Sequence, residues 1–156
     1  MDDAGFLREA VELARESLTD DAGGPFGAII VLDGRIVGRG RNRVLAQRDP
    51  TAHAEIVAIR DACDRLRTHE LGRTTAYTSS EPCPMCLGAL YWARVDRIVY
   101  AVDRQGAARA GFDDAFFYDD MCRDPADRHV RTEHLPMEEA LAVIQAWRRR
   151  PDRQGY

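Results

Sequence analysis

The chain has 156 residues, of which 45% are hydrophobic and 31% are charged, and its formal net charge is −4. This length favours one domain that buries a core without disulfides, and the apolar fraction excludes a disordered chain. All 22 basic residues are arginines, which excludes Schiff-base lysine chemistry and a lysine under a nucleotide phosphate. The negative charge argues against nucleic acid as a partner, since phosphates bind to clustered basic residues.

The N-terminal residues indicate the compartment. Residues 1–10 carry acidic side chains where a secretory signal would have a basic region. No apolar run approaches the roughly 20 residues that cross a bilayer. We therefore expect a cytoplasmic protein that has no membrane partner. In that compartment, cysteines are more typical of a metal or redox site than of disulfides, and the chain has four of them: Cys63, Cys83, Cys86 and Cys122.

In chain order, the first half of the sequence predicts a helix, a β-hairpin and a second helix. Apolar residues recur at helical spacing from Phe6 to Leu18. Two β-rich runs, Gly27 to Leu32 and Arg35 to Gly40, flank Asp33-Gly34, which is a strong hairpin signal. The stretch from His53 to Arg67 has one apolar stripe and is predicted as the second helix.

The second half predicts alternating strands and helices. The expected elements are a strand over Thr74 to Ser79, a helix from Pro82-Cys83-Pro84 through Trp92, a strand over Arg97 to Val102, a loop over 103–112, and helices over Asp113 to Met121 and Met137 to Arg149. This alternation predicts an α/β fold with helices on both faces of the sheet, and the hairpin makes the sheet mixed. No repeat or linker interrupts the chain, so we expect residues 1–156 to form a single domain.

Four residues at the starts of two predicted helices point to chemistry. His53 and Glu55 open one helix, and Cys83 and Cys86 lie at i and i+3 in the first turn of another, so both sulfurs project to one side. A helix N-terminus favours the thiolate, which is the form that binds zinc. One imidazole and two thiolates leave the fourth position of a tetrahedral zinc for water, which is the catalytic pattern. Glu55 is the natural group to take a proton from the water and deliver it to a substrate nitrogen.

Other interpretations of each part are open. A lone histidine is usually a surface or core residue, and a lone Cys-x-x-Cys also suits a redox pair or a structural zinc. Cys63 falls on the apolar stripe and is expected in the core, whereas Cys122 has no visible partner. The combined pattern H-x-E…P-C-x-x-C is the signature of zinc deaminases of nucleobases. We therefore predict a Zn²⁺-dependent deaminase and keep a non-catalytic zinc-binding or redox module as the alternative.

At these residues the sequence resembles the cytidine deaminase-like zinc hydrolases, and within them the small bacterial guanine deaminases. The matching stretches are residues 24–28, 49–55, 81–89, 91–94, 110–114 and 145–148. The resemblance implies a three-layer α/β/α sandwich around a five-stranded mixed sheet. It also implies a hydrolase acting on a C–N bond of a cyclic amidine, with guanine converted to xanthine and ammonia.

The resemblance also implies contacts with a small purine substrate. Asn42 would hydrogen-bond the base, the backbone N–H of Ala54 would contact its carbonyl, and Phe26 would line a stacking wall. Asp114 would contact the substrate and help to move protons. Each of these residues has an ordinary structural interpretation as well: Asn42 as a turn residue, Phe26 as core, and Asp114 as a solvated acid behind a helix cap.

Trp92 and Tyr156 would wall the pocket by the same resemblance. It further implies a homodimer, and a helix and tail over residues 136–156 that close the active site of their own subunit or, by exchange, that of the partner. A helical tryptophan is more often core, and chain termini are usually frayed.

The zinc motif does not select the substrate. Deaminases of guanosine or cytidine, of cytosine, and of tRNA adenosine remain alternatives within the same chemistry. A tRNA enzyme needs a basic docking surface, which the charge of −4 does not favour.

Overall fold

The computed structural model describes residues 1–112 and 114–155. The chain divides into two compact units, residues 1–118 and residues 119–156. The first unit contains the sheet together with His53, Glu55, Cys83 and Cys86.

Four strands form the sheet of the described residues in the order β2-β1-β3-β4. They are β1 (Gly27–Leu32), β2 (Arg35–Arg41), β3 (Thr74–Ser80) and β4 (Arg97–Val102). Strand β1 pairs antiparallel with β2 and β3, whereas β3 and β4 are parallel. The predicted strands and the mixed sheet are confirmed.

The strand count differs from the five that the resemblance implied. In the described part of the chain β4 ends the sheet, and residues 131–137 form neither helix nor strand. The reason is visible in the sequence, since residues 122–136 are mostly polar and contain no run of β-forming residues.

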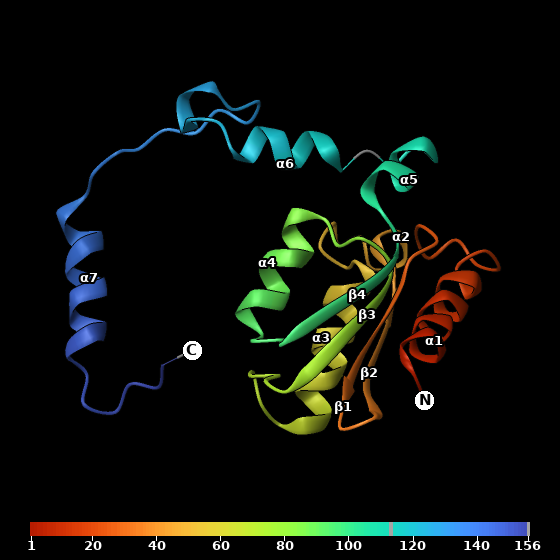
Figure 1. The fold of residues 1–156 in the computed structure, drawn as a ribbon. Coiled ribbons are helices and arrows are strands. Elements are labelled where there is room, and N and C mark those ends of the chain that lie inside the picture. Colours follow the sequence, from red (N-terminus) through yellow and green to blue (C-terminus); the bar gives the residue numbers. More distant parts are fainter. Residues whose placement is uncertain (113, 156) are drawn as a thin grey trace. The chain divides into compact units, whose positions relative to one another are not determined.

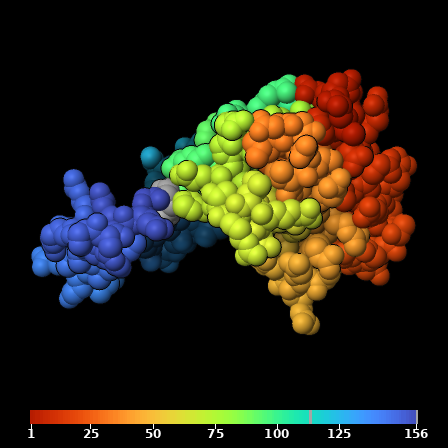
Figure 2. Space-filling model, turned by 90° about the horizontal axis from the view of Figure 1, so that it is seen from below, coloured from red at the N-terminus to blue at the C-terminus, as the bar shows by residue number. Residues whose placement is uncertain are grey.

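Helices cover both faces of this sheet (Figure 1). Helix α1 (Asp3–Glu16) lies on one face, and α3 (Ala54–Leu66) and α4 (Pro84–Trp92) lie on the other. In Figure 2 the orange hairpin residues lie between the red residues of α1 and the yellow-green residues that follow α3. Alternate residues of β1 point to the two cores: Ile29 and Val31 pack with Phe6, and Ala28 and Ile30 with Ala58 and Leu90. The α/β/α sandwich is therefore confirmed.

Helix α1 is also fastened to the sheet by polar contacts. The Arg97 guanidinium donates to both carboxylate oxygens of Asp3 at 2.9 and 2.6 Å, and the Tyr77 hydroxyl donates to Asp3 at 2.7 Å. The hydrogen bond from Arg97 and then that from Tyr77 lower the pKa of Asp3 to about 2.

The structure confirms the predicted hairpin turn but contains two short helices that the sequence pattern did not predict. Asp33 and Gly34 have φ of 48° and 75°, as a two-residue type I′ hairpin requires. The predicted loop over 103–112 is wrong in part, because Arg104–Arg109 forms helix α5. Asp103 begins this helix by accepting from the Gly106 N–H at 2.7 Å. The helix has only six residues and no apolar periodicity to predict it. Helix α2 (Val44–Gln47) was not predicted either.

Three further elements complete the chain. They are α6 (Ala115–Met121), a 3₁₀ turn over Pro125–Asp127 and α7 (Glu138–Arg149). Helix α7 begins one residue after its predicted start, and its apolar residues Leu141, Val143, Ile144 and Trp147 are 44–70% exposed. Among the described residues, no helix combines the length and the apolar character needed to cross a bilayer.

Candidate metal centre and active site

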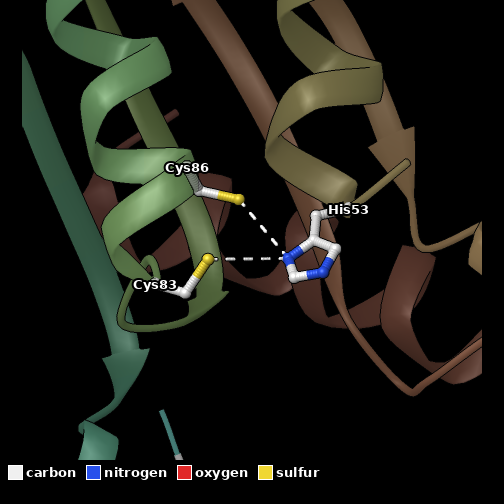
Figure 3. Close-up of side chains that lie close together, drawn as sticks. All are labelled: His53, Cys83 and Cys86. Atoms are coloured by element: carbon white, nitrogen blue, oxygen red, sulfur yellow. Dashed lines mark hydrogen bonds between the residues drawn. The ribbon is translucent and has the colours of Figure 1, made fainter. Parts of the chain in front are cut away.

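The N-termini of α3 and α4 bring three metal-binding side chains together (Figure 3). His53 is the N-cap residue of α3 and Cys83 that of α4, and both have extended backbones that turn their side chains away from the helix axis. The Nδ1 atom of His53 lies 3.6 Å from the Cys83 sulfur and 3.5 Å from the Cys86 sulfur. The three donor atoms all lie within 4.8 Å of one another.

These separations fit a single zinc ion. Bonds of about 2.3 Å to sulfur and about 2.0 Å to nitrogen at tetrahedral angles place sulfur and nitrogen about 3.6 Å apart. One imidazole nitrogen and two sulfurs also form a donor set that zinc prefers. Among the described residues, this is the one group of three or more histidine, cysteine or acidic side chains with such convergent donors.

The two thiols differ in how readily they lose a proton. The hydrogen bond from Cys86, followed by the one with His53, lowers the pKa of Cys83 to about 4. The hydrogen bond to Cys83 and burial raise the pKa of Cys86. The pair thus holds one proton, which a metal ion would displace. Hydrogen bonding to Cys83 raises the pKa of His53.

Glu55 lies in the first turn of α3, two residues after His53. Its side chain is buried, and burial raises its pKa to about 6. It lines the same cavity as His53. A carboxyl group beside a metal site, in a cavity that admits a substrate, can carry protons between water and that substrate.

A cavity of about 440 Å³ opens beside these groups. Five of the residues predicted for the site line it: Phe26, Asn42, His53, Glu55 and Asp114. Its volume lies in the range of small-molecule sites, roughly 300–1,000 Å³. The structure therefore brings the predicted metal ligand His53, both predicted catalytic carboxyl groups and two predicted substrate contacts to one cavity.

Asn42 is held in one orientation. Its side chain is buried, and its Oδ1 accepts from the backbone N–H of Val44 at 3.1 Å. Because the oxygen is used in this way, the amide presents its NH₂ group as a donor. Gly23 makes room for the amide, since a Cβ at position 23 would lie 2.0 Å from Oδ1 of Asn42.

Several residues that line the cavity were not predicted as site residues from the sequence. They are Gly23, Gly24, Val44, Leu45, Ser80, Glu81, Phe112 and Phe117. Phe112 forms an edge-to-face pair with Phe26, with ring centroids 4.8 Å apart. Phe112 lies within the matching stretch 110–114, so that stretch was the signal that could have found it. Phe117 has no comparable signal in the sequence.

A second cavity, about 390 Å³ in volume, adjoins the first. The two cavities share Phe26, Ser80 and Phe112 in their walls. The second is lined mainly by apolar groups, among them Val11, Pro25 and Val102. The two aromatic rings, together with Ser80, therefore contribute to both spaces.

Two predicted substrate contacts, Ala54 and Trp92, are not among the lining residues of the cavity. Ala54 is the first residue of α3, and the first N–H groups of a helix have no acceptor within it. Trp92 is 65% exposed at the far end of α4 from Cys83. Tyr156 lies outside the described residues. These three contacts stay predictions.

The remaining cysteines take no part in the metal site. Cys63 packs against the core on α3, as its place on the apolar stripe predicted. Cys122 is exposed. Imidazole and thiols at two helix N-termini on an α/β sandwich are the features that define the zinc deaminases as a class.

The comparison with known proteins gives the family. Residues 1–102 match the family described as the cytidine and deoxycytidylate deaminase zinc-binding region, and the chain belongs to this family.

Three relatives show the range of activities around this chain. Guanine deaminase of Bacillus subtilis (strain 168) is 46% identical over 97% of both chains, and its crystal structure matches all of this chain and 99% of its own with a TM-score of 0.96. A guanine deaminase structure from Nitrosomonas europaea is 34% identical, with a TM-score of 0.65 over 70% of this chain and 63% of that one. A tRNA-specific adenosine deaminase of Aquifex aeolicus is 36% identical over 89% of both chains.

Proposed function

We propose that this protein is a guanine deaminase that converts guanine and water into xanthine and ammonia. The observation that carries the proposal is the full-length likeness to the Bacillus subtilis guanine deaminase, in sequence and in structure. The His53, Cys83 and Cys86 cluster supplies the metal site that this reaction needs.

The cavity provides contacts that suit a planar purine. The NH₂ group of Asn42 donates to an acceptor on the base, and the rings of Phe26 and Phe112 offer apolar surface to its faces or edge. Asp114 lines the same cavity and accepts from a ring or exocyclic N–H of the base. These groups orient the base so that its amine-bearing carbon faces the metal site.

Glu55 carries the protons of the reaction. His53, Cys83 and Cys86 would hold the zinc, which would supply Lewis acidity that lowers the pKa of water toward about 7. Glu55 takes one proton from the attacking water and delivers it to the adjacent ring nitrogen. It then takes the second proton, from the hydroxyl that is now bonded to the ring carbon, and gives it to the departing amine. The C–N bond breaks, ammonia leaves and a carbonyl takes its place. Because Glu55 is buried, these transfers occur away from bulk solvent.

The test is ammonia release from a panel of substrates by the zinc-loaded protein. The panel holds guanine, guanosine, cytosine, cytidine, adenine and a tRNA anticodon stem-loop with adenosine at the wobble position. We expect guanine to give the highest kcat/KM by at least tenfold, with xanthine as the product. A preference for the stem-loop would contradict the proposal and favour tRNA deamination, which the relative from Aquifex aeolicus represents.

A zinc-free preparation with a reversible Cys83–Cys86 disulfide and no activity on any substrate would favour a redox module. Metal analysis and thiol titration of the purified protein distinguish this outcome from a narrow substrate range.

We also propose that the protein is a homodimer in which residues 136–156 contribute to the assembly and to closing the active site. The support is the apolar stripe of α7, whose Leu141 and Ile144 are 56% and 65% exposed. A helix with such a stripe usually buries it against another surface.

Sedimentation equilibrium tests this assembly. We expect Ile144→Glu to shift the protein toward monomer and to raise the KM for guanine. Ala142→Glu introduces the same carboxylate on the opposite face of α7 and serves as the control. A monomeric wild-type protein, or equal effects of both variants, would contradict the proposal.

A further inference from the structure

Glu81 occupies the position just before the metal-binding motif. It follows the last residue of β3, and its N–H donates to the Val102 carbonyl at the end of β4 at 2.7 Å. Its side chain is only 14% exposed, although it carries a charge. A carboxylate this well covered needs strong partners.

Arg104 supplies these partners from the start of α5. Its backbone N–H donates to one carboxylate oxygen of Glu81 at 2.9 Å, and its Nε and a terminal NH₂ group donate to the other at 2.9 and 2.6 Å. Charge-assisted contacts of this kind fix geometry as well as supplying energy. These contacts hold Arg104, which follows β4, against Glu81, which precedes the loop that carries Cys83.

Tyr118 completes the arrangement from α6. The Arg104 guanidinium stacks on its ring at 3.8 Å from the centroid, and its hydroxyl donates to the Pro82 carbonyl at 2.7 Å. Pro82 immediately precedes the ligand Cys83. Tyr118 also lies one helical turn after Asp114, because its N–H donates to the Asp114 carbonyl at 3.4 Å.

Together these contacts connect two parts of the site that are distant in sequence. We propose that Glu81, Arg104 and Tyr118 form a latch that holds the Cys83 loop against the segment carrying Asp114. Arg104 and Tyr118 are positioning residues: they act on the reaction by fixing Cys83 and Asp114 relative to each other. The effect on turnover rests on the proposed function, whereas the effect on the metal loop does not.

The first experiment measures transfer of zinc from the loaded protein to a chromogenic chelator. Tyr118→Phe removes the hydroxyl that anchors Pro82 and keeps the ring under Arg104. Arg104→Lys keeps the charge but loses the paired guanidinium contacts and the stacking. We expect transfer to accelerate about fivefold in Tyr118→Phe and about tenfold in Arg104→Lys, with the same starting zinc content.

Arg73→Lys is the matched control. One terminal NH₂ group of Arg73 donates to both carboxylate oxygens of Asp33 at 2.9 and 3.0 Å. Arg73 lies just before the first residue of β3, at the opposite end of that strand from Glu81. We expect its zinc transfer to stay within about twofold of the wild-type rate, as for an exposed pair. Unchanged transfer in both latch variants, or an equal acceleration in Arg73→Lys, would overturn the latch.

The second experiment is a double-mutant cycle on kcat/KM for guanine. We expect Tyr118→Phe to lower kcat/KM about fivefold in the wild-type background but less than about twofold in Asp114→Asn, because the contact acts through Asp114. The same fold loss in both backgrounds would contradict the positioning role. If the wild-type protein releases no ammonia from guanine, the proposed function fails, and the zinc-transfer rates alone decide whether the latch exists.

Discussion

The two sides of the active site are built in different ways. The metal side consists of His53, Glu55, Cys83 and Cys86, all within the N-caps and first turns of two helices that pack on one face of the sheet. The substrate side consists of Asn42, Phe112, Asp114 and their neighbours, which lie in connecting segments around short helices. In the proposed function, regular elements hold the groups for the chemical step, and loops shape the space for the substrate. Single substitutions should therefore act on different steps on the two sides.

Removing the metal should have the largest effect. Exhaustive dialysis against a chelator should abolish ammonia release, because the ligands alone cannot activate water. The zinc-free protein should also melt about 5–10 °C lower, as expected for loss of a ligand present at about 100 times its Kd. Metal analysis, calorimetry and re-addition of zinc check this. Activity that survives metal removal would contradict the role of the cluster.

Glu55→Ala should have the next largest effect. Because Glu55 is expected to carry protons and not to bind the metal, kcat should fall by about 10²–10⁴-fold while zinc content stays the same. Glu12→Ala, an exposed change on α1, is the control. Near-normal turnover in a zinc-loaded Glu55→Ala protein would exclude Glu55 as the proton carrier.

Asn42→Ala should act on the substrate side. Loss of one hydrogen bond to the base should raise the KM for guanine about tenfold and change kcat less. Gln47→Ala, on the exposed end of α2, is the control. If kcat falls more than KM rises, Asn42 stabilises the transition state. The substrate side and the metal side would then not act on separate steps.

Gly23→Ala should also raise the KM for guanine, but less than Asn42→Ala does. The new Cβ would lie 2.0 Å from Oδ1 of Asn42, so the amide must move. We expect KM to rise about threefold in the wild type and to stay unchanged in Asn42→Ala, since neighbouring sites couple. Gly72→Ala is the matched control, because its Cβ would meet nothing within 4 Å. Steady-state kinetics on the wild type, the two single variants, the double variant and the control decides the outcome.

Asp3→Asn, on the opposite face of the sheet, should leave both sides intact. The pKa of Asp3 is lowered to about 2 by Arg97 and Tyr77. The charged pair therefore adds stability at pH values above the ordinary pKa of an aspartate, and this contribution is lost as the pH falls toward 2. We expect a small drop in melting temperature that is greatest above pH 5 and narrows at pH 3, with unchanged kcat. If the drop in melting temperature became larger at low pH, the charged form of Asp3 would not be the stabilising one.

The difference between the metal side, on helix N-termini, and the substrate side, on loops, also explains which site residues could be predicted from the sequence. The metal side depends on local spacing: Cys83 and Cys86 must share a face of one helix turn, and His53 and Glu55 sit at the start of another. The strands were predicted from runs of β-forming residues, and helices α1 and α3 from apolar residues at helical spacing, several of which the fold buries.

The substrate side depends on where loops meet. Helix α5 has no apolar period, so the sequence predicts a loop over 103–112 and gives no sign that Arg104 pairs with Glu81 or that Phe112 packs on Phe26. Asn42 and Asp114 were placed by resemblance, and nothing in their own neighbourhood distinguishes them from a turn residue and a solvated acid. Contacts between residues far apart in sequence leave no periodic signature.

The Phe26–Phe112 ring pair has a consequence for how the enzyme can change. These two side chains stand in the walls of both the cavity beside the metal and the apolar cavity next to it, so their volume limits how far the two spaces can connect. A smaller residue in place of Phe112 would join the two spaces and leave His53, Cys83 and Cys86 untouched. New substrate preferences could therefore evolve in single steps without loss of the catalytic ion.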